Sequence, residues 1–225
     1  RQIVAGSYFL DDRTDAMVLR FTEDGELDPA FGAEGLAVPA PAEKPADGYG
    51  VRVRDDGSIL VVGSIGGEGE LDTALFQFTG TGEPDGGFGD DGILVISAGR
   101  EDDMALAVDV RDQVVLLSGF AMVDGVREFL LISHREEGTA DEGVSFALKT
   151  GEGMTGLWIN ELQVTDAYGR YQRNGTGGED AAQTTILTTP FGYASNDISY
   201  GVAVQPDGRV VAAGLTEEND VTSIA

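Results

Sequence analysis

The chain has 225 residues, with 40 acidic side chains against 14 basic ones and a formal net charge of −26. Phosphate backbones and anionic membrane surfaces are bound by clustered positive charge, so this balance argues against nucleic-acid partners and membrane-surface binding. There is no cysteine, which excludes disulfides, thiol catalysis and thiolate metal sites, and no apolar run approaches the roughly 20 residues of a membrane-spanning helix, so no membrane insertion is expected.

The first predicted elements are short strands. The chain opens on RQIVAG at 1–6, followed by DAMVLRFT at 15–22 and LAVPA at 36–40. Their β-branched and aromatic side chains favour strands over helices. Between the second and third strands lies TEDGELDPAFGAEG at 22–35, a segment rich in glycine and acidic residues.

A hairpin is predicted next, at 50–63 (GVRVRDDGSILVVG), where Asp56-Gly57 supplies the turn. The hairpin recurs as GVAVQPDGRVVAAG at 201–214 and, with a shortened turn, as AVDVRDQVVLLSG at 107–119. Together with the glycine of the opening strand, the closing glycines are spaced by 57, 56 and 95 residues: Gly6, Gly63, Gly119 and Gly214. The last spacing is one period plus an insertion of about 39 residues.

The strand after each hairpin also recurs, as DTALFQFT at 72–79 and REFLLISHR at 127–135, and a short strand, ILVIS, follows at 93–97. No segment combines a sustained 3.6-residue period with helix caps, so no long helix is predicted. Four short strands in a period of about 57 residues are typical of a β-propeller blade. The predicted fold is therefore all-β, an array of four-stranded antiparallel blades, with a β-solenoid or open β-repeat stack as the alternative.

The segment 22–35 is echoed at 79–92 (TGTGEPDGGFGDDG), with seven of the fourteen positions identical. A duplicated ligand site and a duplicated turn would both produce such an echo. The third copy, at 135–145, keeps a glycine and an aspartate but has lost the aromatic residue and the glycine after it. A turn tolerates that drift better than a binding site does. We therefore predict a connector between successive blades, with Phe31 packed between sheets.

The hairpin and the connector together resemble the delta-60 repeat, a β-propeller repeat family of large secreted bacterial proteins. The resemblance covers nearly all of 1–145 and 186–225. It implies a secreted propeller without an established activity, and it carries no catalytic residue across, because the recurring residues are turn and core positions. A single propeller-like domain over 1–225 is expected, as an arc of a longer chain, with these parts: units at about 1–32, 33–89, 90–145 and 186–225, and an insertion at 146–185.

The insertion is the strongest candidate for a binding site. Insertions in repeat arrays map to loops on one face, and that face often binds ligands. A strand is predicted at 158–164 and a loop over 169–183. Aromatic and arginine side chains that can stack on sugar rings or anchor a protein partner are interleaved here: Trp158, Tyr168, Arg170, Tyr171 and Arg173. The alternative is that Trp158 fills a small core within the insertion.

Catalytic and metal-binding chemistry finds little support in the sequence. His134, the single histidine, aligns with Phe21 and Phe78 and is interpreted as a packing substitution. No cofactor and no specific metal site is predicted, although the acidic loops leave calcium as a weak alternative, because calcium accepts carboxylate oxygens. Paired carboxylates of a hydrolase or lyase remain an alternative, but nothing in the sequence singles out two particular acidic residues.

The predicted function is a non-enzymatic extracellular β-propeller segment with a structural, adhesive or binding role, secreted or at the cell surface. The expected partners are a protein or a glycan at the cell surface. Three alternatives stay open: a lectin-like propeller that binds carbohydrate through the insertion, a propeller hydrolase or lyase, and a filament subunit that self-associates through exposed strand edges.

Overall fold

The computed structural model describes residues 1–10, 13–39, 44–67, 69–98, 101–111, 114–135, 158–159, 170–172, 184–189, 196–205, 210–218 and 221–224. These residues form antiparallel β-sheets of the β-propeller type, which confirms the predicted fold class. No helix that could span a membrane is found among them. The chain divides into two compact units, Arg1–Ala105 and Leu106–Ala225.

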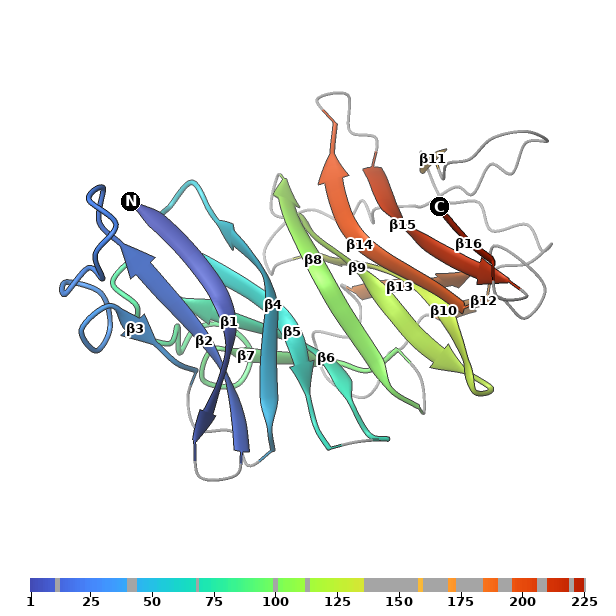
Figure 1. Ribbon diagram of the computed structural model, residues 1–225, viewed down its shortest axis with the longest axis horizontal. Coiled ribbons are helices and arrows are strands. Elements are labelled where there is room, and N and C mark those ends of the chain that lie inside the picture. The colour runs from blue at the N-terminus through green and yellow to red at the C-terminus, as the bar shows by residue number, and fades with distance from the viewer. Residues whose placement is uncertain are drawn as a thin grey trace. The chain divides into compact units, whose positions relative to one another are not determined.

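The first unit contains two antiparallel sheets (Figure 1). Sheet A has the order β1-β2-β3, and sheet B has the order β4-β5-β6-β7. The strands are β1 (Gln2–Leu10), β2 (Arg13–Phe21), β3 (Leu36–Ala37), β4 (Ala46–Val53), β5 (Ile59–Ile65), β6 (Asp72–Phe78) and β7 (Ile93–Ile96). Each overlaps a strand predicted from the repeat.

Sheets A and B use the same pairing register at an interval of 57 residues. Val4 faces Leu19 across β1 and β2, and the equivalent residues Val61 and Phe76 face each other across β5 and β6. A shift by one residue would turn every side chain to the other face, so matching registers mean that equivalent residues occupy equivalent faces.

The core of the first unit lies between these sheets. Sheet A and the connector contribute Ala16, Val18, Phe31 and Ala37, and sheet B contributes Ala46, Ile59, Val61, Ile65, Ala74, Phe76 and Phe78. All of these side chains are buried. Small residues on one sheet thus pack against larger ones on the other, which is how two sheets interlock at close distance.

The closing glycines of two hairpins, Gly63 and Gly214, have a steric reason. A Cβ atom on Gly63 would lie 1.7 Å from the carbonyl oxygen of Asp47 on β4, and one on Gly214 would lie 1.9 Å from that of Ile198. Both hairpins also bulge nearby, between Gly48 and Gly50 in the first and between Ser199 and Gly201 in the second. The glycine therefore repeats because adjacent backbones approach closely there.

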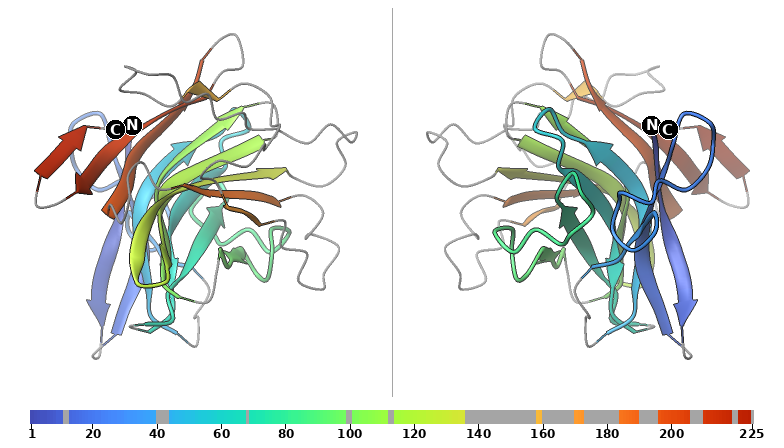
Figure 2. Two further views of the ribbon diagram at one scale, coloured as in Figure 1. Left: turned by 90° about the vertical axis from the view of Figure 1, so that its right-hand side faces the viewer. Right: turned by 90° about the vertical axis from the view of Figure 1, so that its left-hand side faces the viewer.

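The second unit also contains two sheets, whose twisted antiparallel strands are seen from two sides in Figure 2. Sheet C has the order β12-β13-β10-β9-β8; sheet D has the order β11-β15-β14, with β16 also paired to β15. The strands are β8 (Asp103–Arg111, which starts at the end of the first unit), β9 (Val114–Val123), β10 (Val126–Arg135), β11 (Trp158–Ile159), β12 (Arg170–Gln172), β13 (Thr184–Thr189), β14 (Asn196–Val204), β15 (Val210–Glu218) and β16 (Val221–Ile224).

A second core lies between sheets C and D. Val114, Leu116, Phe129 and Leu131 of sheet C pack with Val210 and Ala212 of sheet D, and Val202 and Val204 of β14 complete the cluster. The backbone N–H of Val204 also donates to the Asp109 carboxylate on β8, at 2.8 Å. This unit therefore repeats the sheet-on-sheet packing of the first.

Sheet C obtains its fourth strand from the end of the insertion and the residues that follow it. β13 pairs with β10, with Leu187 opposite Leu131, and so takes the place that β7 takes in sheet B. The loop predicted over 169–183 is wrong in one part, because Arg170–Gln172 forms β12 and pairs with β13. Pairing with a neighbouring strand decides that conformation, and local sequence does not reveal it. Of the strand predicted at 158–164, Trp158–Ile159 forms β11, and the rest lies outside the described residues.

Candidate functional site

The two copies of the connector have the same backbone structure. In both, the N–H of the first threonine donates to the carbonyl of the glutamate four residues on, Thr22 to Glu26 and Thr79 to Glu83, at 2.8 Å. The glycine of each turn, Gly25 or Gly82, has a positive φ of 85° or 92°. Glycine adopts this conformation without a steric penalty, which explains why these two positions are identical.

The first connector holds a buried ion pair. Asp28 is 4% exposed, and its Oδ2 atom accepts from Nε of Arg20 at 2.9 Å, while its Oδ1 atom accepts from the N–H of Ala30 at 3.0 Å. Nε of Arg1 lies 3.3 Å from the same Oδ2 atom. Both carboxylate oxygens thus have partners inside the protein, which offsets the cost of burying the charge.

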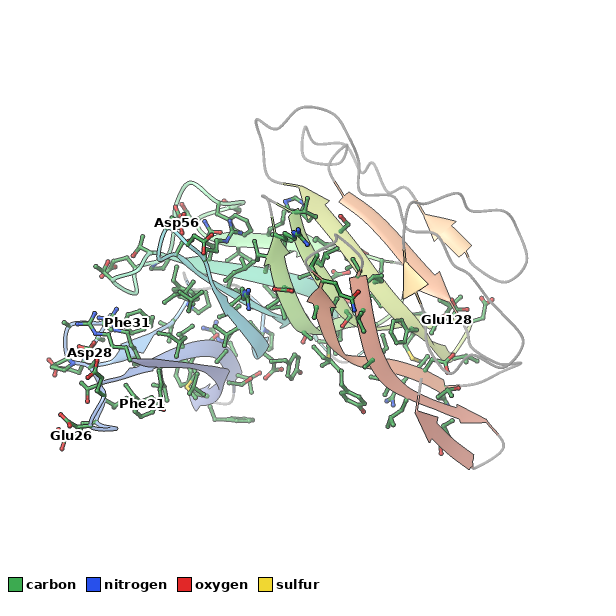
Figure 3. All side chains as sticks on the ribbon, turned by 90° about the horizontal axis from the view of Figure 1, so that it is seen from above. Phe21, Glu26, Asp28, Phe31, Asp56 and Glu128 are labelled. Atoms are coloured by element: carbon green, nitrogen blue, oxygen red, sulfur yellow. The ribbon has the colours of Figure 1, made fainter. Side chains whose placement is uncertain are left out.

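Arg20 also ties the connector to its neighbours. Its Nη1 atom donates to the carbonyl of Gly80, at 2.6 Å, and its Nη2 atom to that of Ala30, at 3.1 Å. The guanidinium lies 4.5 Å from the centroid of the Phe31 ring, a distance typical of a cation–π contact. The labels of Figure 3 place Asp28 and Phe31 together on this connector. Arg20 therefore contacts Asp28, the Phe31 ring and the second connector at the same time.

The second connector repeats the arrangement with a neutral partner. Gln77 stands where Arg20 stands, and its Nε2 atom donates to Oδ2 of Asp85 at 2.8 Å. Oδ1 of Asp85 accepts from the N–H of Gly87, at 3.1 Å. Asp28 and Asp85 each accept a hydrogen bond from the backbone N–H two residues further along the chain. The aspartate therefore closes the turn in both copies, although its side-chain donor is Arg20 in one and Gln77 in the other.

The first connector packs directly on the second. The N–H of Gly32 donates to the carbonyl of Thr81, at 2.8 Å, and Phe31 is fully buried. A Cβ atom on Gly82 would lie 2.9 Å from the Phe31 ring. Phe31 belongs to the core between sheets A and B, as the sequence predicted. The echoed segments are therefore connectors that also bind one another.

The contacts of Asp28 hold its pKa below the ordinary value of 3.8. The hydrogen bond from the Ala30 N–H contributes most to this lowering; burial acts in the opposite direction, and the charges of Arg20 and Arg1 add to the lowering. A carboxylate stabilised in this way stays ionised and acts as a fixed acceptor. It is poorly suited to donate a proton as a general acid.

Asp103 is another buried acid whose environment shifts its pKa. Its side chain is fully buried, its Oδ1 atom accepts from the N–H of Thr73, and its Oδ2 atom accepts from the N–H of Ala98, both at 2.8 Å. Burial raises the pKa of this carboxyl to about 6, although the hydrogen bonds from Thr73 and Ala98 oppose the rise. Asp103 thereby fastens Thr73, near the start of β6, to Ala98, two residues after the end of β7.

The residues predicted to bind a ligand are placed only in part. Trp158 is in β11 of sheet D, opposite Val211, whereas Arg170 and Tyr171 are in β12 of sheet C, opposite Thr188 and Leu187. Their side chains, and all of Tyr168 and Arg173, lie outside the described residues. The binding role of these five residues stays a prediction.

His134 occupies the packing position expected for it. It is 5% exposed, and it faces Val115 on β9 just as its equivalent Phe78 faces Ile59 on β5. Among the residues that the structure describes, no group of three or more His, Cys, Asp or Glu side chains is arranged to hold a metal ion.

Sequence reasoning did not identify Arg20 and Asp103 as organising residues. A signal for Arg20 was available, because Arg20 and Gln77 each precede the connector aspartate by eight residues. Asp103 had no such signal, since its sequence context, EDDM, looks like a solvated acidic turn. The hydrogen bonds of Arg20, Asp28 and Asp103 hold the backbone of the connectors and strands in place.

Comparison with known families gives a match within the first unit. Residues 2–31, which include β1, β2 and most of the first connector, match a family described as a domain of unknown function (DUF5122) beta-propeller. No curated protein matches the chain. The family match and the antiparallel sheets together support a β-propeller repeat.

Proposed function

We propose that the chain is a non-enzymatic extracellular scaffold built from β-propeller repeats of the delta-60 type, with a structural, adhesive or binding role. The observation that carries this proposal is the use of the repeated polar residues within the fold. Arg20, Asp28, Gln77 and Asp85 all bond to their own connector or the next one. A motif repeated for ligand binding would direct such groups outward.

The acidic surface supports the extracellular part of the proposal. A net charge of −26 keeps a protein soluble but makes the compact state repel itself. Salt and divalent cations screen that repulsion. A saline or calcium-containing exterior is therefore the environment in which such a chain is best stabilised.

The binding role is assigned to the insertion at 146–185, and the ligand class to glycans. The support for this is the interleaving of aromatic residues with arginine around Trp158 and Tyr171, because aromatic faces stack on the apolar faces of sugar rings. A protein partner at the cell surface is the remaining candidate, since the same residue types dominate protein interfaces.

A glycan array probed with the labelled chain tests this proposal. Trp158→Ala should weaken the strongest hits by about tenfold, the equivalent of ~1.4 kcal/mol for one lost aromatic contact. Phe9→Ala is the matched control, because Phe9 is an aromatic residue outside the insertion and is 79% exposed. Hits that Trp158→Ala leaves unchanged contradict the assignment to the insertion. Glycan cleavage detected by mass spectrometry contradicts the non-enzymatic role.

A further inference from the structure

The fourth strands of sheets A and C are closed to further pairing. In sheet A, β3 has only two residues, and Pro39, which lacks an N–H, stands where Ile96 stands in sheet B. In sheet C, the fourth strand β13 is paired on both sides, with β10 and with β12. Short strands, prolines and a covering segment are the usual means by which proteins prevent unwanted pairing at a sheet edge.

The fourth strand of sheet B, β7, lacks these forms of protection. It is the edge strand in the order β4-β5-β6-β7, and it is twice as long as β3. Its four residues, ILVI, include no charged residue and no proline, and the side chain of Val95 is 47% exposed. An apolar edge strand of this kind is a template for the addition of another strand.

The backbone of Val95 faces away from sheet B. The carbonyl of Gly92 accepts from the N–H of Gln77 on β6, whereas the N–H and the carbonyl of Ile93 both bond to Asp90, on the outer side of the strand. Successive residues of a strand direct their backbone groups to opposite sides, so Val95 directs its own outward, like Ile93. Among the described residues, the N–H and the carbonyl of Val95 have no hydrogen-bond partner on that side.

Sheet C shows the kind of strand that pairs at this position. β13 aligns with β7 because Leu187 and Leu94 face equivalent leucines of β10 and β6. Ile186 of β13 is thus the equivalent of Val95, and Gln172 of the antiparallel β12 pairs with it. An added strand therefore occupies in sheet C the position that is open in sheet B.

The charges around β7 favour a basic partner. Asp90 and Asp91, just before the strand, are both exposed, and the net charge of the chain is −26. The segment that contains β12 reads YGRYQRN at 168–174, with two arginines and no acidic residue. A basic strand at β7 would be attracted by these carboxylates, whereas a second copy of the chain would bring like charge to the edge.

We propose that the outer edge of β7 binds an extended, arginine- or lysine-containing peptide segment of a partner protein as an additional antiparallel strand. The N–H and the carbonyl of Val95 form the central pair of hydrogen bonds with this segment, and Asp90 and Asp91 attract its basic side chains. The proposal goes beyond the scaffold and glycan-binding role and concerns a different part of the chain. Loss of glycan binding by Trp158→Ala therefore leaves it unaffected.

Fluorescence anisotropy of a labelled synthetic peptide, YGRYQRN, titrated with the full chain tests the proposal. The peptide should bind, and the dissociation constant should rise with salt, because screening weakens the attraction to the acidic edge. The control peptide YGEYQEN has both arginines replaced by glutamate, and it should bind at least about tenfold more weakly. A wild-type chain that does not bind YGRYQRN, or binds both peptides equally, overturns the proposal.

Two variants at one position separate backbone pairing from side-chain contact. Val95→Pro removes the outward N–H without removing a hydrogen bond of sheet B, and it should weaken peptide binding by about tenfold or more. Val95→Thr is the matched control, because threonine keeps the N–H and the β-branched shape, and its affinity should stay within about threefold of the wild type. Equal binding by Val95→Pro and Val95→Thr would place the peptide elsewhere, such as on β13 in place of β12, and overturns the proposal.

Amide hydrogen exchange of the wild type, followed by NMR, gives a test that depends on no variant. The N–H of Leu94, which is directed toward β6, should be protected with and without peptide, whereas that of Val95 should become protected only when YGRYQRN is added. Exchange at Val95 that the peptide leaves unchanged contradicts the proposal. Protection of Val95 that rises with protein concentration in the absence of peptide would assign the edge to a second copy of the chain, and it also overturns the proposal.

Discussion

Arg20 and Asp28 show how a charged pair can be stable inside a repeated turn. Asp28 has partners for both oxygens, and the Arg20 guanidinium also contacts Gly80 and the Phe31 ring. Removing one partner would leave the other buried without compensation. Gln77 and Asp85 show that the same turn can also be built with a neutral donor.

The Asp28 pair should make stability depend on pH in a defined direction. Because the folded-state pKa lies below 3.8, ionised Asp28 favours the folded state above the unfolded-state pKa, and this contribution is lost as the pH falls through the folded-state pKa. Asp28→Asn should therefore unfold more easily than the wild type at neutral pH, with a difference that shrinks in acid. Chemical denaturation at several pH values measures it. Asp24→Asn, at an exposed position, should show no such difference.

Asp103 should act in the opposite direction. Its folded-state pKa is raised to about 6 from 3.8, so the folded state holds the proton more tightly, and stability falls as the pH rises between these values. The difference in unfolding free energy between the wild type and Asp103→Asn should decrease over this window by an amount on the order of 3 kcal/mol, at 1.36 kcal/mol per pKa unit. A difference that grows with pH would mean that the Thr73 and Ala98 hydrogen bonds outweigh burial.

At the scale of elements, the connectors explain why the chain repeats glycine at fixed positions. Gly25 and Gly82 share the same turn conformation, but their surroundings differ. Nothing lies within 4 Å of a Cβ atom on Gly25, whereas one on Gly82 would meet the backbone of Gly32 at 2.8 Å and the Phe31 ring at 2.9 Å. The positive φ of the turn favours glycine in both copies. At Gly82 the close packing against Gly32 and Phe31 is a second reason for glycine.

These two glycines form a matched pair for mutation. Gly25→Asn should destabilise the protein by about 1 kcal/mol or less, since asparagine tolerates positive φ. Gly82→Asn should cost about 2–4 kcal/mol, because overpacking against Phe31 adds to the backbone term. Urea unfolding of both variants measures the difference. Equal losses would argue against the contact between the two connectors.

At the scale of the whole molecule, much of the fold could be predicted because the repeat period follows from the spacing of the recurring motifs. The strand positions and the alignment of His134 with Phe78 followed from spacing alone, and the strand registers confirm them. The fourth strand of sheet C could not be placed in this way. Thr184–Thr189 joins β10 across the insertion, and a pairing between distant segments leaves no local pattern.

The candidate site was less accessible to sequence reasoning than the fold. Aromatic and arginine residues in the insertion drew attention to Trp158 and Tyr171, whose binding role stays a prediction. The burial of the Arg20–Asp28 pair was not evident from the sequence, because an acidic residue in a glycine-rich segment, such as Asp28, is normally expected to be solvated. Its burial follows from packing between sheets, which appears only once the chain has folded.

The measurement that tests the central claim most directly is the unfolding free energy of Phe31→Ala. If the echoed segment is a connector that plugs the core between two sheets, loss of this fully buried ring should cost about 3–5 kcal/mol. Phe9→Ala, at a ring that is 79% exposed, should change the value by less than about 0.5 kcal/mol. A Phe31→Ala protein as stable as the Phe9→Ala control would contradict the account.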